Sequence, residues 1–303
     1  MNSNTAGENS NDDYLHEPDE RDKWREAYYF NWVDLDNKVS GFSTLAILPN
    51  IMKREFVFLL YYNNHTEAYY REPDLESYDA DISSMLIDKR LKYSMVKPLE
   101  KWRIEYKSRK LSFDITFENR YPLYYFGKDS SASWHRHFEA SGKIEGTLKL
   151  KNNTEFKIKG FGQRDKSWGY RDWHQFDKWF AGHFQFENWT CGFRKDYVNG
   201  KVDLSGYIGR EQQNNQLSSM EIDVKYDSDA FNSPLETIYT FSDIKGNKFR
   251  IKAKRIGKKS FMRFARDFDK GYTELFEQMV IMKDLDSGEI GSGMSEQLRT
   301  VLS

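Results

Sequence analysis

Apolar and polar residues alternate over many short segments of this chain, a pattern typical of β-strands with one face in a core. Turn-forming residues separate neighbouring segments. The Asn63-Asn64 pair between residues 55–62 and 66–70, for example, predicts a β-hairpin. Strands are expected over residues 25–33, 42–48, 55–62, 66–70, 102–106, 111–117, 143–150, 155–158, 179–186, 190–194, 202–209, 220–226, 237–241, 248–256 and 275–283.

Helical patterns are scarce. Residues 81–91 place Ile82, Met85 and Leu86 at helical spacing, and they predict one short helix. Because strands do not alternate with long helices, a parallel sheet with crossover helices is not expected, and the many short antiparallel strands indicate barrels or sandwiches. We expect an all-β protein with a flexible polar tail over residues 1–20, one β domain over 21–159 and a second over 160–303.

Charge and hydropathy exclude several classes of protein. The chain has 46 Lys and Arg against 47 Asp and Glu, a net charge of -1, so no nucleic-acid partner is expected. Its mean hydropathy is -0.83, and no run of about 18 apolar residues occurs, so no integral membrane segment is expected. Cys191 is the one cysteine, which excludes an intramolecular disulfide. The polar N-terminus lacks the apolar segment of a signal peptide, and a cytoplasmic location is expected.

Aromatic residues make up 16% of the chain, which fits both strand cores and the walls of a site for a bulky apolar ligand. Most of the tryptophans lie in the stretch from Trp134 to Trp189. Within it, residues 160–173 read GFGQRDKSWGYRDW and contain two Arg-Asp dipeptides, each following a glycine and preceding a tryptophan. This segment is where the sequence carries most information about chemistry.

The residue types of this segment allow acid–base chemistry. An arginine binds a carboxylate through two parallel hydrogen bonds, and a neighbouring tryptophan shields the pair from water. An aspartate buried among tryptophans has its charged form disfavoured and can donate a proton, whereas one held by arginine keeps its charge. The sequence leaves open which of Asp165 and Asp172 has which role. The alternative is a structural corner, in which ion pairs under tryptophan lids tie a strand end.

A resemblance to a known family rests on these residues. Residues 160–173, with the preceding 137–146 (HFEASGKIEG), resemble the lipocalin-like family that includes hydroxyneurosporene synthase, a carotenoid hydratase, and AttH-like proteins. Residues 276–278 and 291–296 resemble its closing strand pair. Lys166 stands where many members have histidine, so a base at that place would have to come from another residue. The positions that match the family motif are Gly160, Gly162, Arg164, Asp165, Ser167, Trp168, Gly169, Arg171, Asp172 and Trp173.

The resemblance implies two consecutive lipocalin-like antiparallel barrels or half-barrels, packed together, over most of residues 22–297. Related folds host carotenoid hydration and pericyclic cyclisation of polyenes, so it also implies a long, apolar, alkene-bearing substrate in a barrel cavity. We therefore expect a terpenoid or polyene cyclase or hydratase that acts on a hydrophobic small molecule without a cofactor. The alternatives are a lipophilic binding protein without turnover and a pericyclase that only shapes its substrate.

Each candidate residue has an expected role in this chemistry. Histidine titrates near neutral pH and suits a general base. No spacing motif joins the histidines to a third ligand, so no metal site is expected. The candidates are Asp165 and Asp172 as acids, Arg164 and Arg171 as groups that orient the carboxylates or bind an anionic end of the substrate, His137 and His174 as bases, and Trp134, Trp168, Tyr170, Trp173 and Trp179 as rings against the substrate.

Overall fold

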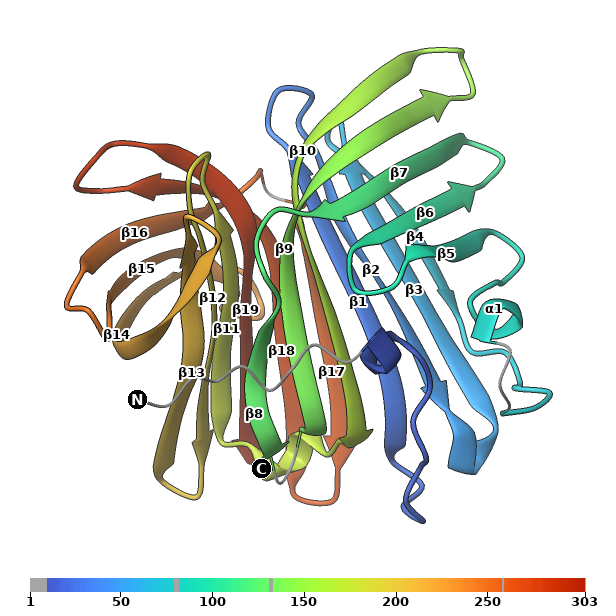
Figure 1. The fold of residues 1–303 in the computed structure, drawn as a ribbon, viewed down its shortest axis with the longest axis horizontal. Helices are drawn as coiled ribbons and strands as arrows, with labels where there is room; N and C mark the ends of the chain where they lie inside the picture. Colours follow the sequence, from blue (N-terminus) through green and yellow to red (C-terminus); the bar gives the residue numbers. More distant parts are fainter. Residues whose placement is uncertain (1–9, 79–81, 131–132, 258, 303) are drawn as a thin grey trace. The chain divides into compact units, whose positions relative to one another are not determined.

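The computed structural model describes residues 10–78, 82–130, 133–257 and 259–302. The chain divides into two compact units, Met1–Arg171 (unit 1) and Asp172–Ser303 (unit 2), each built almost wholly from antiparallel strands (Figure 1). The expected all-β, lipocalin-like fold is thereby confirmed. No helix of the described ranges is long and apolar enough to cross a membrane.

Unit 1 is an open sheet that curves into a half-barrel. Its strands are β1 (Trp24–Asp34), β2 (Val39–Leu48), β3 (Lys53–Tyr62), β4 (His65–Arg71), β5 (Leu91–Lys97), β6 (Lys101–Lys107), β7 (Leu111–Asn119), β8 (Tyr124–Ser130), β9 (Trp134–Leu150) and β10 (Glu155–Tyr170). They form a 10-stranded sheet in the order β4-β3-β2-β1-β10-β9-β7-β6-β5, with β8 paired to β9. The first and last strands of the unit, β1 and β10, therefore meet at the middle of the sheet.

The central strands of unit 1 are buried on both faces. Nearly every residue of β1 is buried, whereas burial alternates along β6. Strands of the first kind read as continuous apolar runs and those of the second kind as alternations, and both patterns occur in the sequence. A polar side chain on β1, or on the buried second half of β10, is thus largely removed from water and needs a protein partner.

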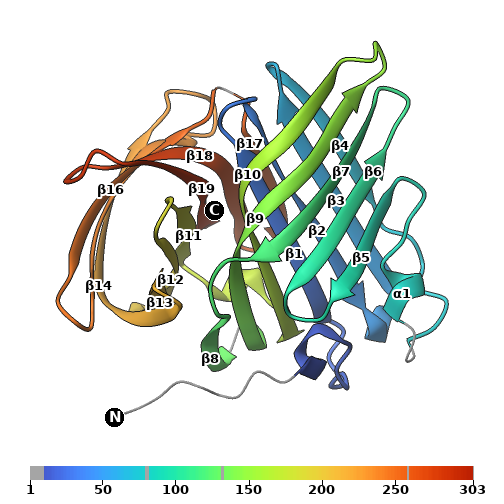
Figure 2. The same ribbon diagram turned by 45° about the horizontal axis from the view of Figure 1, so that its top comes forward.

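Unit 2 is a closed barrel with one additional strand. Its strands are β11 (Lys178–Gln185), β12 (Thr190–Val198), β13 (Lys201–Arg210), β14 (Gln213–Tyr226), β15 (Pro234–Asp243), β16 (Lys248–Arg255), β17 (Phe261–Phe268), β18 (Gly271–Asp284) and β19 (Ile290–Leu302). The sheet order is β16-β15-β14-β13-β12-β11-β19-β18-β17. Pairing of β16 with residues 280–284 of β18 closes the ring (Figure 2), and β17 pairs with the preceding residues 271–278 of the same strand.

Each predicted strand lies within an observed strand or extends past its end by one residue, and most observed strands are longer. The predicted helix over 81–91 is largely wrong. Only α1 (Ile82–Met85) is helical, and Ile87 already bridges to Lys92 at the start of β5. Alternation predicted neither β5 nor β8 nor β17.

Two expected boundaries also need correction. The domain boundary at residues 159/160 falls inside β10, because the strand runs on through Tyr170 before the chain passes to unit 2. The expected tail over 1–20 lies partly outside the described residues. From the short 3-10 helix η1 (Ser10–Asp13) onward, however, the chain is packed on unit 1, and Asp13 has no exposed surface. Two further 3-10 helices are η2 (Pro49–Ile51) and η3 (Trp173–Gln175).

Gly160→Ala is expected to destabilise the protein, because an added Cβ would lie 2.1 Å from the carbonyl oxygen of Val33 in β1. Backbone cannot give way as the end of a flexible side chain can, so the unfolding free energy should fall by about 1–3 kcal/mol in chemical denaturation. Gly200→Asn is the control, because that site has φ +74 and nothing within 4 Å, and asparagine tolerates this conformation. Equal losses at the two sites would contradict the steric explanation.

Candidate functional site

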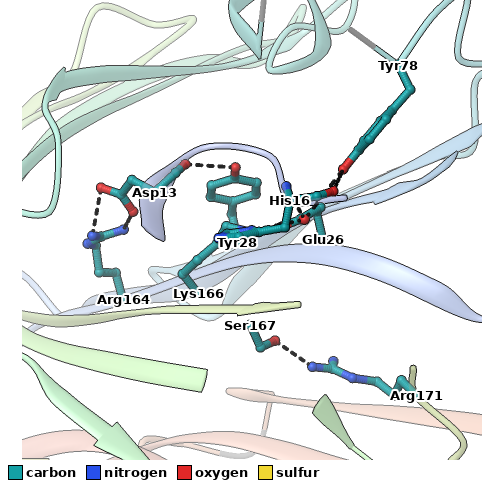
Figure 3. A network of polar contacts seen from close by, with 9 residues as sticks. All are labelled: Asp13, His16, Glu26, Tyr28, Tyr78, Arg164, Lys166, Ser167 and Arg171. Atoms are coloured by element: carbon teal, nitrogen blue, oxygen red, sulfur yellow. Dashed lines mark hydrogen bonds and ion pairs between the residues drawn. The ribbon is translucent and has the colours of Figure 1, made fainter. Parts of the chain in front are cut away.

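β10 carries most of the motif segment through the middle of unit 1, and its side chains alternate between the two faces of the sheet. Arg164, Lys166 and Trp168 point to the face on which η1 packs. Asp165 and Ser167 point to the opposite face, and Figure 3 shows Ser167 across the ribbon from Lys166. The expected corner is therefore a continuous strand whose two faces carry different chemistry.

On the first face, Arg164 forms a buried ion pair with Asp13. Its Nη1 and Nη2 donate to the two carboxylate oxygens of Asp13 at 2.8 and 3.0 Å, and neither side chain is exposed (Figure 3). The same carboxylate also accepts hydrogen bonds from the backbone N–H of Leu99 and from Trp102 Nε1. This contact fastens η1 to the centre of the sheet.

Two positions further along β10, Lys166 forms a second buried ion pair, with Glu26. The backbone N–H of His16 donates to Glu26 Oε1 at 2.8 Å, and the His16 ring stacks on Trp168 with centroids 3.7 Å apart. Burial on its own would raise the pKa of Glu26, but Lys166 and His16 outweigh it and hold that pKa below its usual value. Burial lowers the pKa of Lys166 against the pull of Glu26. The Lys166–Glu26 pair thus holds the N-terminal segment at His16, through the hydrogen bond that Glu26 accepts.

Two tyrosine hydroxyls complete this network, as Figure 3 shows. Tyr28 donates to the backbone oxygen of Asp13 at 3.0 Å, and Tyr78 donates to the backbone oxygen of His16 at 2.6 Å. Burial raises the pKa of both hydroxyls, so they remain protonated donors. On this face, buried hydrogen bonds and ion pairs thus hold the N-terminal segment against the sheet.

The opposite face of β10 brings an imidazole and two carboxylates together. In the register of β9 and β10, Asp165 lies opposite Glu139 and Ser167 lies opposite His137. His137 Nε2 is 3.9 Å from Asp165 Oδ1 and 4.0 Å from Glu139 Oε1. His137 and Glu139 are buried, and the side chain of Asp165 is 22% exposed. A largely buried imidazole beside two carboxylates is an arrangement suited to general acid–base chemistry.

Aromatic rings and an arginine border this cluster. The ring of Phe126 stacks on His137 at 4.8 Å between centroids, and that of Trp134 lies at 4.6 Å. Arg171 Nη2 donates to Ser167 Oγ at 2.7 Å. Within the described ranges, no group of three or more His, Cys, Asp or Glu side chains could hold a metal ion. We call His137, Glu139 and Asp165, with these two rings, the His137 cluster.

Four further candidates, Asp172, Trp173, His174 and Trp179, belong to unit 2. Asp172 precedes η3, which contains Trp173 and His174, and His174 Nδ1 is 2.9 Å from a threonine hydroxyl of β18. Trp179 Nε1 in β11 donates to a glutamate of β19 at 2.6 Å, and the guanidinium of Arg194 lies 4.0 Å from the centroid of its ring. The side chains of His174 and Trp179 are thus held by other strands of unit 2.

Of the predicted site residues, the structure brings His137, Asp165 and Trp134 together. Arg164 does not contact the neighbouring Asp165. Successive residues of a strand point to opposite faces, so Arg164 binds Asp13 instead. Trp168 lies on the Arg164 face against His16, and Tyr170 lies under the guanidinium of Arg21 at 4.3 Å.

Sequence reasoning missed Asp13, Glu26 and Glu139. Glu139 could have been found, because it follows His137 by two residues and so shares its face in a strand. Partners for Arg164 and Lys166 could also have been sought, since buried charges are almost always paired. Nothing in the sequence shows that the partner of Arg164 lies in a segment of polar, tail-like composition.

Asp13→Asn is expected to destabilise the protein by about 3–5 kcal/mol, because it leaves the guanidinium of Arg164 buried without a counter-charge. Urea denaturation measures the loss. Asp19→Asn is the control, since the Asp19–Arg21 pair is largely exposed and such pairs contribute roughly 0–1 kcal/mol. Similar small losses in both variants would show that η1 is not held by the ion pair.

The Glu26–Lys166 pair should govern part of the acid stability. A carboxylate whose pKa is held below its usual 4.5 stabilises the folded state above that pH, and the stabilisation is lost as the pH falls through the folded pKa. The double variant Glu26→Gln/Lys166→Met removes this titration. Between low pH and about pH 5, the unfolding free energy of the wild type should therefore rise more steeply with pH than that of the double variant. Urea denaturation at a series of pH values measures both. A pH-independent difference would contradict this linkage.

Comparison with known proteins supports the fold. No curated protein matches the sequence. Similar solved structures include CghA with Sch210972 (TM-score 0.66, 11% identity, covering 93% of this chain and 89% of that chain). They also include kievitone hydratase from Nectria haematococca (0.59, 10%, 91% and 89%) and an AttH-like protein from Nitrosomonas europaea (0.65, 8%, 93% and 93%). At these identities the likeness establishes the architecture, which agrees with the broad lipocalin-like family and not with hydroxyneurosporene synthase in particular.

One family matches nearly the whole chain. It is described as a domain of unknown function, DUF7064, and the match covers residues 9–301, both units included. The protein therefore belongs to the DUF7064 family.

Proposed function

We propose that the protein is an enzyme that protonates an alkene of a lipophilic terpenoid or polyene, leading to hydration or ring closure. The observation that carries the proposal is the position of His137, whose Nε2 lies within 4.0 Å of the carboxylates of both Asp165 and Glu139. Titratable groups at this separation influence one another's protonation, and one water molecule between them is enough to pass a proton. Aromatic rings on two sides of the imidazole fit an apolar reactant.

In hydration, Asp165 acts as the acid and His137 as the base. The proton of the Asp165 carboxylic acid moves to one alkene carbon, which leaves positive charge on the other. The oxygen of a water molecule bonds to that carbon while His137 accepts a water proton. Transfer of this proton from His137 to Asp165 through one bridging water molecule restores the site, since the two groups are 3.9 Å apart, and the sum is the addition of one water molecule to the alkene.

In ring closure, a second alkene of the substrate attacks the cationic carbon in place of water. His137 then removes a proton from the cyclised cation, so that the product is an isomer of the substrate. The ring of Trp134 beside the imidazole stabilises the passing positive charge by about 0.5–2 kcal/mol. The carboxylate of Glu139, 4.0 Å from His137 Nε2, favours the imidazolium that forms in either reaction.

The fold likeness supports this proposal. A kievitone hydratase and CghA, which was solved with the small molecule Sch210972, share the architecture over about nine-tenths of the chain. Two other functions predict different behaviour. A pericyclase would need no proton from Asp165, and a carrier would bind the lipophilic molecule and return it unchanged.

Asp165→Asn and His137→Gln are expected to lower turnover by about 10²–10⁴-fold, because each removes one partner of the proton transfer. Purified protein is incubated with a panel of polyprenyl and polyene compounds in D₂O or in H₂¹⁸O, and products are analysed by mass spectrometry. Uptake of deuterium identifies protonation, and ¹⁸O identifies hydration.

Asp114→Asn is the matched control, an exposed aspartate of β7 paired with Arg103, and it should keep full turnover. Asp172→Asn is run beside it to test the other candidate acid. Full turnover in Asp165→Asn would overturn the assignment of the acid. Product without deuterium would indicate a pericyclase, and binding without product would indicate a carrier.

A further inference from the structure

Contacts that cross the inside of the unit 2 barrel identify the side chains that point inward. β15 and β19 are not neighbours in the sheet, yet the Tyr239 hydroxyl and Ser295 Oγ are 2.7 Å apart. β14 and β19 are also not neighbours, and Gln297 Nε2 donates to the Tyr226 hydroxyl at 2.9 Å. Alternation along β19 then places Arg299 on the inward-facing row with Ser295 and Gln297.

The two ends of this interior differ in polarity. One end is a tightly packed aromatic core that includes Phe184, Phe193 and Phe241. At the other end, near the loop of residues 227–233 between β14 and β15, Gln297 and Arg299 replace apolar residues. Of these two, Gln297 is buried, and a buried polar residue is far less common than an exposed one.

Gln297 has one buried polar atom without a hydrogen-bond partner. The residue is 6% exposed, and its Oε1 makes no hydrogen bond to any residue that the structure describes. Turning the amide over does not help, because the Tyr226 hydroxyl donates as readily as it accepts and one amide atom is still left over. A buried amide atom in this state costs free energy, which a ligand that binds it recovers.

Arg299, which follows Gln297 on the inward-facing row, shares a single carboxylate with a second arginine. Arg263 and Arg299 each donate through Nε to Glu274 at 2.6 Å, so two guanidinium groups share one carboxylate. Arg299 Nη2 donates to the backbone oxygen of Phe231, and its Nη1 makes no hydrogen bond within the described part of the chain. This trio carries a net charge of about +1.

A third arginine lies at the same end of the barrel. Arg255 is buried, and it donates to the neutral side chains of Gln278 and Ser233. Its nearest carboxylate is that of Asp227 at 4.0 Å, beyond hydrogen-bonding distance. Asp229 is a further carboxylate in this loop, and it is hydrogen-bonded to Ser233.

Apolar surface borders these charges. Tyr226 is 41% exposed and Phe231 is 46% exposed, although both are large aromatic residues. The guanidinium of Arg263 lies 4.5 Å from the centroid of the Phe231 ring, and that of Arg299 lies 6.0 Å from the Tyr226 ring. Rings and guanidinium groups at this spacing fit a molecule that has an anionic head and an apolar body.

We propose that this end of the unit 2 barrel binds a lipophilic carboxylic acid, with its carboxylate between Gln297 and Arg299 and its apolar body on Tyr226 and Phe231. The Gln297 amide turns so that its Nε2 donates to the ligand and its Oε1 accepts from Tyr226. Arg299 contributes its Nη1 hydrogens without leaving Glu274. The site uses no residue of the His137 cluster, so it stands or falls independently of the proposed catalysis.

The experiment is a fluorescence titration of the full chain with cis-parinaric acid, a polyene carboxylic acid, and with its methyl ester. Wild type should bind the acid saturably and about 10-fold more tightly than the ester, since only the acid forms charge-assisted hydrogen bonds. Arg299→Met should lose about that factor for the acid and bind the ester unchanged. Gln297→Leu should weaken acid binding by about 5-fold.

Arg250→Met is the matched control, because Arg250 is an exposed arginine of β16 paired with Asp286. It should bind the acid like wild type, and so should Asp165→Asn in unit 1. Arg299→Met is expected to fold, since Glu274 keeps Arg263, and thermal unfolding checks this. No saturable binding, equal affinities of wild type for acid and ester, or unchanged acid affinity in folded Arg299→Met would overturn the proposal.

Discussion

Buried charge on β10 is the constraint on which unit 1 depends. Arg164 and Lys166 enter the centre of the sheet without exposed surface, and an ion left unpaired in such a place costs several kcal/mol. Asp13 and Glu26 meet this requirement, one from the N-terminal segment and one from the adjacent strand. The position of η1 is therefore set by a counter-charge as much as by apolar packing.

The same alternation separates support from chemistry. Arg164 is paired with Asp13 on one face of the sheet, so Asp165 is not needed as its partner. Asp165 lies on the other face, beside His137. A dipeptide that reads as an ion pair in the sequence thus serves two different purposes. The glycines of the segment have a third purpose: a side chain at Gly160 would collide with β1, which pairs with β10 along most of its length.

Local patterns predicted the fold better than they predicted the site. The run EFVFLLYY lies in β3, and the hairpin turn after it forms where asparagines tolerate positive φ. The strand over residues 91–97 was not predicted, and the helix predicted from Ile82, Met85 and Leu86 overlapped its first residue. His137 and Asp165 could be chosen from residue type, but their distance depends on the register of β9 against β10. A register shift of one residue would place the two side chains on opposite faces of the sheet.

The pairing of β1 with β10 has a consequence for the order in which the chain becomes ordered. The contact between Asp13 and Arg164 spans 151 residues, and β1 lacks its central neighbour until β10 exists. During synthesis, one edge of β1 therefore has no hydrogen-bonding partner until β10, the last strand of the unit, has been made. Contacts of such sequence separation slow folding. The N-terminal residues of unit 1 are thus synthesised first but are among the last to form their native contacts, which they make with β10.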